Sequence, residues 1–230
     1  VVPIVVGAIL FDLGLEGDDK IRPGPECGFA AADGASSEPA AEGSVGAGAG
    51  ATVGKMGPRG TSMKGGFGTA SITLDNGLVV AAAVTVNAVG DIIDPATGEV
   101  VAGVRKEDGS GFADARLLLR ASGRGGEDRE VQAGTNTTIG VVATNATLTK
   151  VQATKMAQMA QDGFARAIYP AHTMGDGDTV FSLATGVFEG QANVTLIGAL
   201  AADVMAEAIL RAVRLAEGLP GIPSVSDLGN

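Results

Sequence analysis

The chain has 230 residues, of which 45% are hydrophobic and 3% aromatic, and a net charge of −10. This length is enough for one domain with a sizeable core, and the acidic balance argues against nucleic-acid binding, which needs clustered Lys and Arg. Cys27 is the single cysteine, so an internal disulfide is excluded. With His172 as the single histidine, too few ligands remain for a zinc site, and we expect no metal and no cofactor.

The first third of the chain predicts one strand followed by glycine-rich loops. Val1–Leu13 is apolar but too short to span a bilayer, so it predicts a buried strand and no membrane contact. Residues 14–41 predict a loop with a short Ala-rich helix. The glycine-rich run 44–54 precedes Lys55 but fails both the phosphate-loop and the dinucleotide patterns. It predicts a strand packed closely against another layer.

The middle of the chain leads to a pair of adjacent hydroxyl residues. Asp75-Asn76-Gly77 is a hairpin signal, and an apolar strand is predicted over residues 78–87. Residues 106–133 are charged and Gly-rich and predict a mobile linker. Thr137 and Thr138 then open a β-rich run that ends at residue 144. A hydroxyl at the start of a buried strand is either a firmly held nucleophile or an ordinary strand residue, and both interpretations stay open here.

The last third predicts two helices and one strand. Thr149 and Gln152 form a capping box ahead of a helix that Pro170 ends. A strand is predicted over residues 179–185 and an Ala-rich helix over 198–217. Strands in two blocks, each accompanied by helices, indicate an α+β fold in a single domain over residues 1–230.

The residues around the two threonines resemble the processing site of a known family. Asn136-Thr137-Thr138-Ile139, followed by Val-Val-Ala-Thr-Asn-Ala, is similar to this site in the DmpA-type aminopeptidases and their relatives, the nylon-oligomer hydrolases. The resemblance covers most of the chain. It implies a four-layer α/β/β/α sandwich whose chain cuts itself at Asn136–Thr137 into residues 1–136 and 137–230. Thr137 then becomes an N-terminal nucleophile, whose α-amino group, with a pKa near 7.7–8.0, acts as the base.

The resemblance also implies the roles of four further residues. Lys55 lies beside the nucleophile, and Asn87 donates its amide to the oxyanion. Asp176 and Asp178, two residues apart, form a carboxylate pair that orients the amine and the lysine. Without the family, Asp-Gly-Asp is equally typical of a solvated turn. Two residues have possible supporting roles: Thr138 is the rival nucleophile, and His172 is expected to pack or hydrogen-bond under the Asp176 loop.

The predicted function is an autoprocessing N-terminal threonine amidohydrolase acting on short peptides or peptide-like oligoamides. An endohydrolase of aminohexanoate oligomers is the first alternative, and a non-catalytic oligomerising protein of the same fold is the second. One departure bears on the choice, since the serine branch of the family carries Gly-Glu-Thr where this chain has Val6-Gly7-Ala8. That departure puts an acid that anchors the substrate amine in doubt. The resemblance further implies a segment before Val1, a cytoplasmic location and a homo-oligomer of processed heterodimers.

Overall fold

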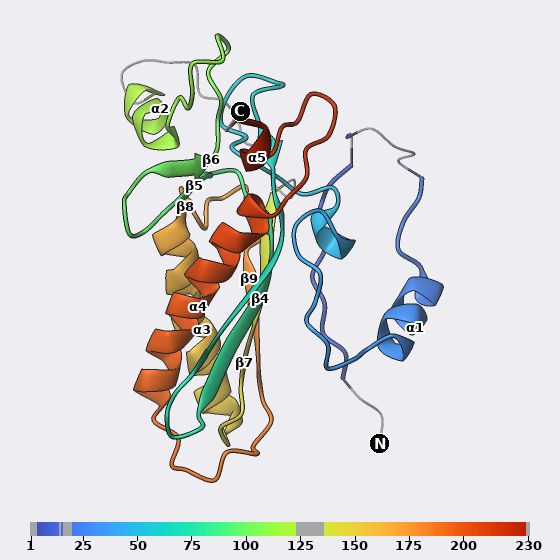
Figure 1. Ribbon diagram of the computed structural model, residues 1–230, viewed down its shortest axis with the longest axis vertical. Helices are drawn as coiled ribbons and strands as arrows, with labels where there is room; N and C mark the ends of the chain where they lie inside the picture. The colour runs from blue at the N-terminus through green and yellow to red at the C-terminus, as the bar shows by residue number, and fades with distance from the viewer. Residues whose placement is uncertain (1–3, 14, 16–19, 123–135, 229–230) are drawn as a thin grey trace.

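A four-stranded sheet forms the centre of the molecule (Figure 1). The computed structural model describes residues 4–13, 15, 20–122 and 136–228. The strand order in the sheet is β3 (Gly66–Thr73), β4 (Val79–Asn87), β7 (Thr137–Thr144) and β9 (Thr179–Ala184). β4 runs antiparallel to both β3 and β7, whereas β7 and β9 are parallel. The predicted hairpin is confirmed, with Gly77 at φ 84° in the turn between β3 and β4.

Two long helices cover one face of this sheet (Figure 1). α3 (Lys150–Ala167) begins at the predicted capping box, in which Gln152 N donates to Thr149 Oγ1 and Thr149 N donates to Gln152 Oε1. α4 (Val194–Arg214) begins four residues before the predicted start, because Asn193 caps it by accepting from Leu196 N.

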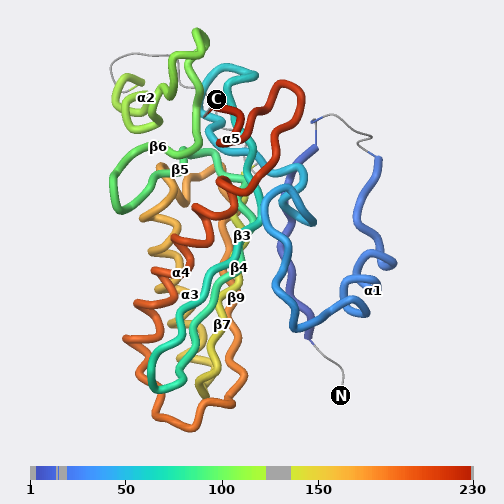
Figure 2. The backbone as a smooth tube through the Cα atoms, in the orientation of Figure 1, coloured from blue at the N-terminus to red at the C-terminus, as the bar shows by residue number. Residues whose placement is uncertain are grey.

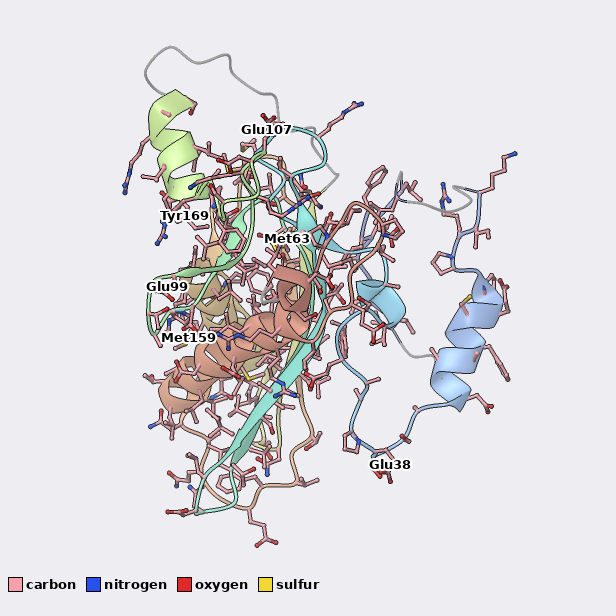
Figure 3. All side chains as sticks on the ribbon, turned by 45° about the horizontal axis from the view of Figure 1, so that its top comes forward. Glu38, Met63, Glu99, Glu107, Met159 and Tyr169 are labelled. Atoms are coloured by element: carbon pink, nitrogen blue, oxygen red, sulfur yellow. The ribbon has the colours of Figure 1, made fainter. Side chains whose placement is uncertain are left out.

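Side chains of alternating strand residues form the core with the helices. The helix-facing residues of β4 include Val80 and Val84, and they pack with Phe164 of α3 and Met205 of α4 in one buried cluster. The two helices approach closely, and Met159, labelled in Figure 3, lies against Gly198 of α4. A Cβ at residue 198 would overlap that thioether, so the glycine permits the close approach.

The remaining elements are short. Asp91 joins two of them, since it starts β5 and accepts a hydrogen bond from Ala115 N at the start of α2 (2.7 Å); it also accepts one from Val104 N in the loop after β6 (2.8 Å). These elements are α1 (Pro25–Asp33), the 3₁₀ turn η1 (Gly46–Gly48), β1 (Thr52–Val53), β2 (Met63–Lys64), β5 (Asp91–Ile93), β6 (Val100–Ala102), α2 (Ala115–Ser122), β8 (Ile168–Tyr169) and α5 (Val225–Leu228).

Three sequence-based predictions differ from the structure. Residues 4–13 form no strand and are mostly exposed, with Ile4 93% and Ile9 87% accessible, so apolar composition alone was misleading there. The run 44–54 contains a 3₁₀ turn and a two-residue strand in place of a long strand, although the close packing predicted for it is found at Gly48, against the backbone of Phe67. The predicted linker contains α2, and its residues 123–133 lie outside the described part of the chain.

The other face of the sheet is only half covered. Ala81, Ala83, Val141 and Ala143 alternate with the core residues and are partly exposed. They line an open hollow of about 650 Å³ together with Thr69, Ser71 and the Arg211 side chain. α1 lies across from the helix pair, on this side of the sheet (Figures 1 and 2). Among the described residues, no helix is both long and apolar enough to cross a membrane.

Candidate active site

Thr137 and Asn87 face each other across two neighbouring strands. Thr137 is the first residue of β7 and Asn87 the last of β4, and the antiparallel register pairs them directly. Directly opposed residues carry their side chains on the same face of a sheet. Residues 80, 82 and 84 of β4 point to the helices, so Thr137 and Asn87 lie on the half-covered face, at its end.

The hydroxyl of Thr137 contacts the peptide bond that precedes it. Thr137 Oγ1 donates to Asn136 O at 2.6 Å, and the same carbonyl oxygen accepts from Gly177 N at 2.8 Å. Thr137 is 4% exposed and Asn136 2%. In the uncut chain the hydroxyl is therefore buried and held against a carbonyl that already carries a second donor.

Lys55 and Asn87 form one hydrogen-bonded unit beside this junction. Lys55 Nζ donates to Asn87 Oδ1 (2.7 Å) and Asn87 O (3.2 Å), and Thr52 N donates to the same Oδ1 (3.0 Å). The amide nitrogen of Asn87 donates to Phe11 O at 2.9 Å. Desolvation lowers the pKa of Lys55 to about 7, against a smaller opposing attraction to Asp176 and Asp12. Both forms of the amine are thus populated near neutral pH.

The Asp-Gly-Asp segment holds the chain on either side of Thr137, through the carboxylate of Asp178 and the backbone of Asp176. Asp178 Oδ1 accepts from Thr138 N at 2.8 Å, and Asp176 forms a parallel β-bridge with Asn136. Asp176 Oδ2 accepts from Thr173, while its Oδ1 is buried and accepts no hydrogen bond from any residue that the structure describes. Burial raises the pKa of Asp178, and the charge of Asp176 adds to the effect.

The two possible supporting residues have different surroundings. His172 stacks on Phe164, with ring centroids 5.8 Å apart, and its Nδ1 lies 3.0 Å from Asp178 Oδ2. The His172 backbone N–H also donates to Asp178 Oδ2, at 3.0 Å. Thr138 is fully buried on the helix side of the sheet, and its hydroxyl has no hydrogen-bond partner within the described chain.

Three residues that the sequence analysis did not single out also belong to this region. Asp12 lies with Lys55 and Phe11 in the lining of a hollow of about 370 Å³. Lys64 is fully buried and donates to the carbonyls of Gly48 (3.1 Å), Ala49 (3.0 Å) and Ala51 (2.9 Å). Gly177 contacts the junction through its backbone, so its residue type carried no chemical signal. Within residues 4–13, 15, 20–122 and 136–228, no group of three or more His, Cys, Asp and Glu could hold a metal ion.

Comparison with known proteins gives a family and several relatives. A family model described as Peptidase family S58 matches residues 1–225. The chain is 42% identical to an uncharacterized aminopeptidase of Mycobacterium leprae, over 97% of this chain and 64% of that protein. It is 39% identical to an uncharacterized aminopeptidase of Mycobacterium bovis, over 99% and 68%. It is 29% identical to the 6-aminohexanoate-oligomer endohydrolase of a Kocuria species, over 92% and 61%. The chain thus spans about two thirds of these relatives.

Solved structures show the same fold at low sequence identity. A β-aminopeptidase of a Burkholderia species superimposes with a TM-score of 0.57 at 24% identity, over 86% of this chain and 56% of that one. The L-aminopeptidase D-Ala-esterase/amidase of Ochrobactrum anthropi, whose structure is described as a variant of the Ntn hydrolase fold, gives a TM-score of 0.57 at 20% identity, over 86% and 53%. The mixed α/β fold of this chain is therefore similar to the folds of these two aminopeptidases.

Proposed function

Because the chain belongs to peptidase family S58, we propose that it is a self-cleaving N-terminal threonine hydrolase of peptide or amide bonds. The bond cut is Asn136–Thr137, and Thr137 is the nucleophile in both self-cleavage and turnover. The observation that carries the proposal is the 2.6 Å contact between Thr137 Oγ1 and the carbonyl oxygen of the preceding residue. This contact holds a buried hydroxyl next to the peptide bond that has to be cleaved.

The strand geometry favours Thr137 over Thr138. Adjacent residues of a strand point to opposite faces, so the two hydroxyls cannot share one site. Thr137 shares its face with Asn87, whereas Thr138 points to the helix side and is fully buried. The Thr138 backbone contributes instead, because its N–H holds Asp178.

Cleavage creates the base for turnover. The freed α-amino group of Thr137 has an ordinary pKa of about 7.7–8.0, so a useful fraction is neutral at pH 7 and accepts the hydroxyl proton. The backbone of Asp176 pairs with Asn136, and its buried Oδ1 accepts no hydrogen bond within the described chain, so this oxygen is the proposed acceptor for the new amine. The pKa of Lys55 is lowered to about 7. While Lys55 is charged it favours the neutral form of the Thr137 α-amino group, and near neutral pH it takes part in proton transfer. The Asn87 amide donates to the substrate oxyanion after its hydrogen bond to the Phe11 carbonyl has broken.

The finer architecture is part of the same proposal. One face of the sheet is covered by α3 and α4, and the other is partly exposed and lined by small residues. A second sheet and helix layer over that face would complete an α/β/β/α sandwich. The processed protein would consist of residues 1–136 and 137–230 and assemble as a homo-oligomer of these heterodimers, without a cofactor. Its proposed location is the cytoplasm.

The proposed substrates are short peptides or peptide-like oligoamides with a small free N-terminus. The aminopeptidase relatives support this choice, and Asp12 in the hollow beside Lys55 offers a carboxylate for a substrate amine. Cleavage of aminohexanoate oligomers is the alternative, which the more distant Kocuria relative supports. Values of kcat/KM for an alanine p-nitroanilide, its N-acetylated form and an aminohexanoate oligomer separate the two. A strong preference for the free amine rejects the oligomer hydrolase, and equal rates on the acetylated compound reject the aminopeptidase.

Intact-mass analysis of the purified protein tests self-cleavage. We expect two fragments that meet at Asn136–Thr137. Thr137→Ala should stay as one chain and be inactive, whereas the neighbouring control Thr138→Ala should still cut, because its hydroxyl lies on the helix side. An intact, folded wild-type chain, or a fragment beginning at residue 138, would contradict the proposal. A persistently uncut chain would instead support the non-catalytic oligomerising protein.

A further inference from the structure

The Asp176–Gly177–Asp178 segment holds the cleavage junction through its backbone as well as through the Asp178 carboxylate. Asp178 binds Thr138 N, and the central residue donates its own N–H to Asn136 O at 2.8 Å. That oxygen belongs to the scissile peptide group itself. The contact therefore touches the atom on which negative charge would develop during self-cleavage.

We propose that the backbone N–H of Gly177 is the oxyanion donor for self-cleavage, an inference that rests on the function proposed above. Thr137 Oγ1 forms a bond to the carbonyl carbon of Asn136, and the π electron pair of that carbonyl moves onto its oxygen. The oxyanion re-forms the carbonyl as the Asn136–Thr137 C–N bond breaks, and the amine receives the hydroxyl proton. Water then hydrolyses the resulting ester, which releases the Asn136 carboxylate and restores the hydroxyl.

The contacts of Asn136 O explain why this donor is needed. In the uncut chain the oxygen accepts from both Thr137 Oγ1 and Gly177 N. The hydroxyl has to leave the oxygen in order to attack the carbon, so its hydrogen bond is lost as charge builds up. The Gly177 N–H stays in place and is already oriented, which is the property that makes an oxyanion donor effective.

The donor for the chain's own bond differs from the one proposed for substrates. Asn87 Nδ2 donates to Phe11 O in the uncut chain, so at least one of its N–H groups is directed away from the junction. Gly177 reaches the junction without any rearrangement. Self-cleavage and turnover thus depend on different donors.

The side chain at residue 177 is restricted by the nucleophile. An added Cβ would lie 3.0 Å from Thr137 Oγ1 and 3.6 Å from Thr137 Cγ2. Gly177 is not in the left-handed region, so its backbone conformation does not itself demand glycine. The missing side chain leaves the Thr137 hydroxyl room to turn from the oxygen toward the carbon.

Replacing the N–H by an oxygen tests the donor directly. Cell-free translation with glycolic acid at position 177 converts the amide to an ester and changes no side chain. We expect self-cleavage to slow by about 10²–10³-fold, the usual effect of losing one oxyanion donor. The matched control is glycolic acid at position 175, because Gly175 N donates only within the same loop, to Thr173 Oγ1 at 3.2 Å. This control should cut within a few-fold of wild type, and resistance to limited proteolysis checks that both variants fold.

Three outcomes would overturn the inference. One is cleavage of the 177 ester within about threefold of the wild-type rate, and another is equal slowing of the 175 and 177 esters, which would indicate a general loop effect. The third concerns Gly177→Ala, which keeps the N–H but crowds the Thr137 hydroxyl. We expect this variant to cut faster than the 177 ester. The reverse order would make space rather than the donor decisive. A wild-type chain that never cuts would refute the proposed function as well, which distinguishes that failure from the first three.

Discussion

Asn87→Asp separates the amide donor of Asn87 from its acceptor role. Asn87 Oδ1 accepts from Lys55 Nζ and Thr52 N, and a carboxylate can accept both bonds. The substitution keeps the Oδ1 acceptor, removes the Nδ2 donor that also binds Phe11 O, and adds a negative charge where the oxyanion would form. If the amide stabilises the oxyanion, kcat/KM should fall by about 10²–10³-fold, equivalent to about 3–4 kcal/mol.

Asn145→Asp is the matched control at the far end of the same strand pair. Asn145 Oδ1 accepts from Val79 N at 2.8 Å, and its Nδ2 donates to Gly77 O at 2.8 Å. Both asparagines accept from a backbone N–H and donate to a backbone carbonyl, but Asn87 is fully buried and Asn145 half-buried, so Asn145→Asp should cost less stability, about 1 kcal/mol. Only Asn87→Asp should lose activity.

The assay is hydrolysis of an alanine p-nitroanilide by protein whose processing has been verified by mass. Unfolding in urea, followed in parallel, shows how much of any loss of activity is a loss of folded protein. A fall in kcat/KM of less than about tenfold in Asn87→Asp would refute the oxyanion role. An equal fall in Asn145→Asp would show that the sheet, and not the donor, controls activity.

Two further predictions concern the fully buried Lys64 and the partly buried Lys55. Lys64→Met removes a fully buried ammonium that donates hydrogen bonds to three carbonyls, two of these bonds being buried. The carbonyls would lose their donor, so the free energy of unfolding measured in urea should fall by about 2–5 kcal/mol. The exposed control Lys155→Met should change the free energy of unfolding by less than about 0.5 kcal/mol. Equal effects of the two substitutions would show that Lys64 has no special structural role. The pKa of Lys55 is lowered from 10.5 to about 7, so between these pH values the unfolded chain binds a proton that the folded chain lacks. The free energy of unfolding should therefore rise with pH above 7, by at most about 1.4 kcal/mol per unit for this group, and Lys55→Met should lose that contribution. An unchanged pH profile in Lys55→Met would contradict it.

Local sequence signals determined most of the regular elements. The Asp75-Asn76-Gly77 turn, the Thr149 capping box and the apolar strand β4 each depend on residues close together in the chain, and each was predicted correctly. Residues 4–13 were predicted wrongly as a buried strand, because apolar composition records only a preference for burial. Whether a partner strand is available is a property of the fold.

The choice between Thr137 and Thr138 shows where family resemblance and geometry meet. The two residue types are identical, so composition could not separate them, and the resemblance favoured Thr137. The register of β4 and β7 supports the same choice, because it places Thr137 opposite Asn87 and turns Thr138 toward the helices.

Contacts made by the backbone were decided by the tertiary structure alone. Gly177 lies far along the chain from Asn136, and its N–H is identical to every other backbone N–H, so the sequence carried no sign of this hydrogen bond. Lys64 also looked like an ordinary charged residue, yet it is fully buried among three carbonyls. Side-chain chemistry and short-range periodicity can be read from the order of residues. The pairing of distant backbone groups and the desolvation of a charge depend on which segments the fold brings together.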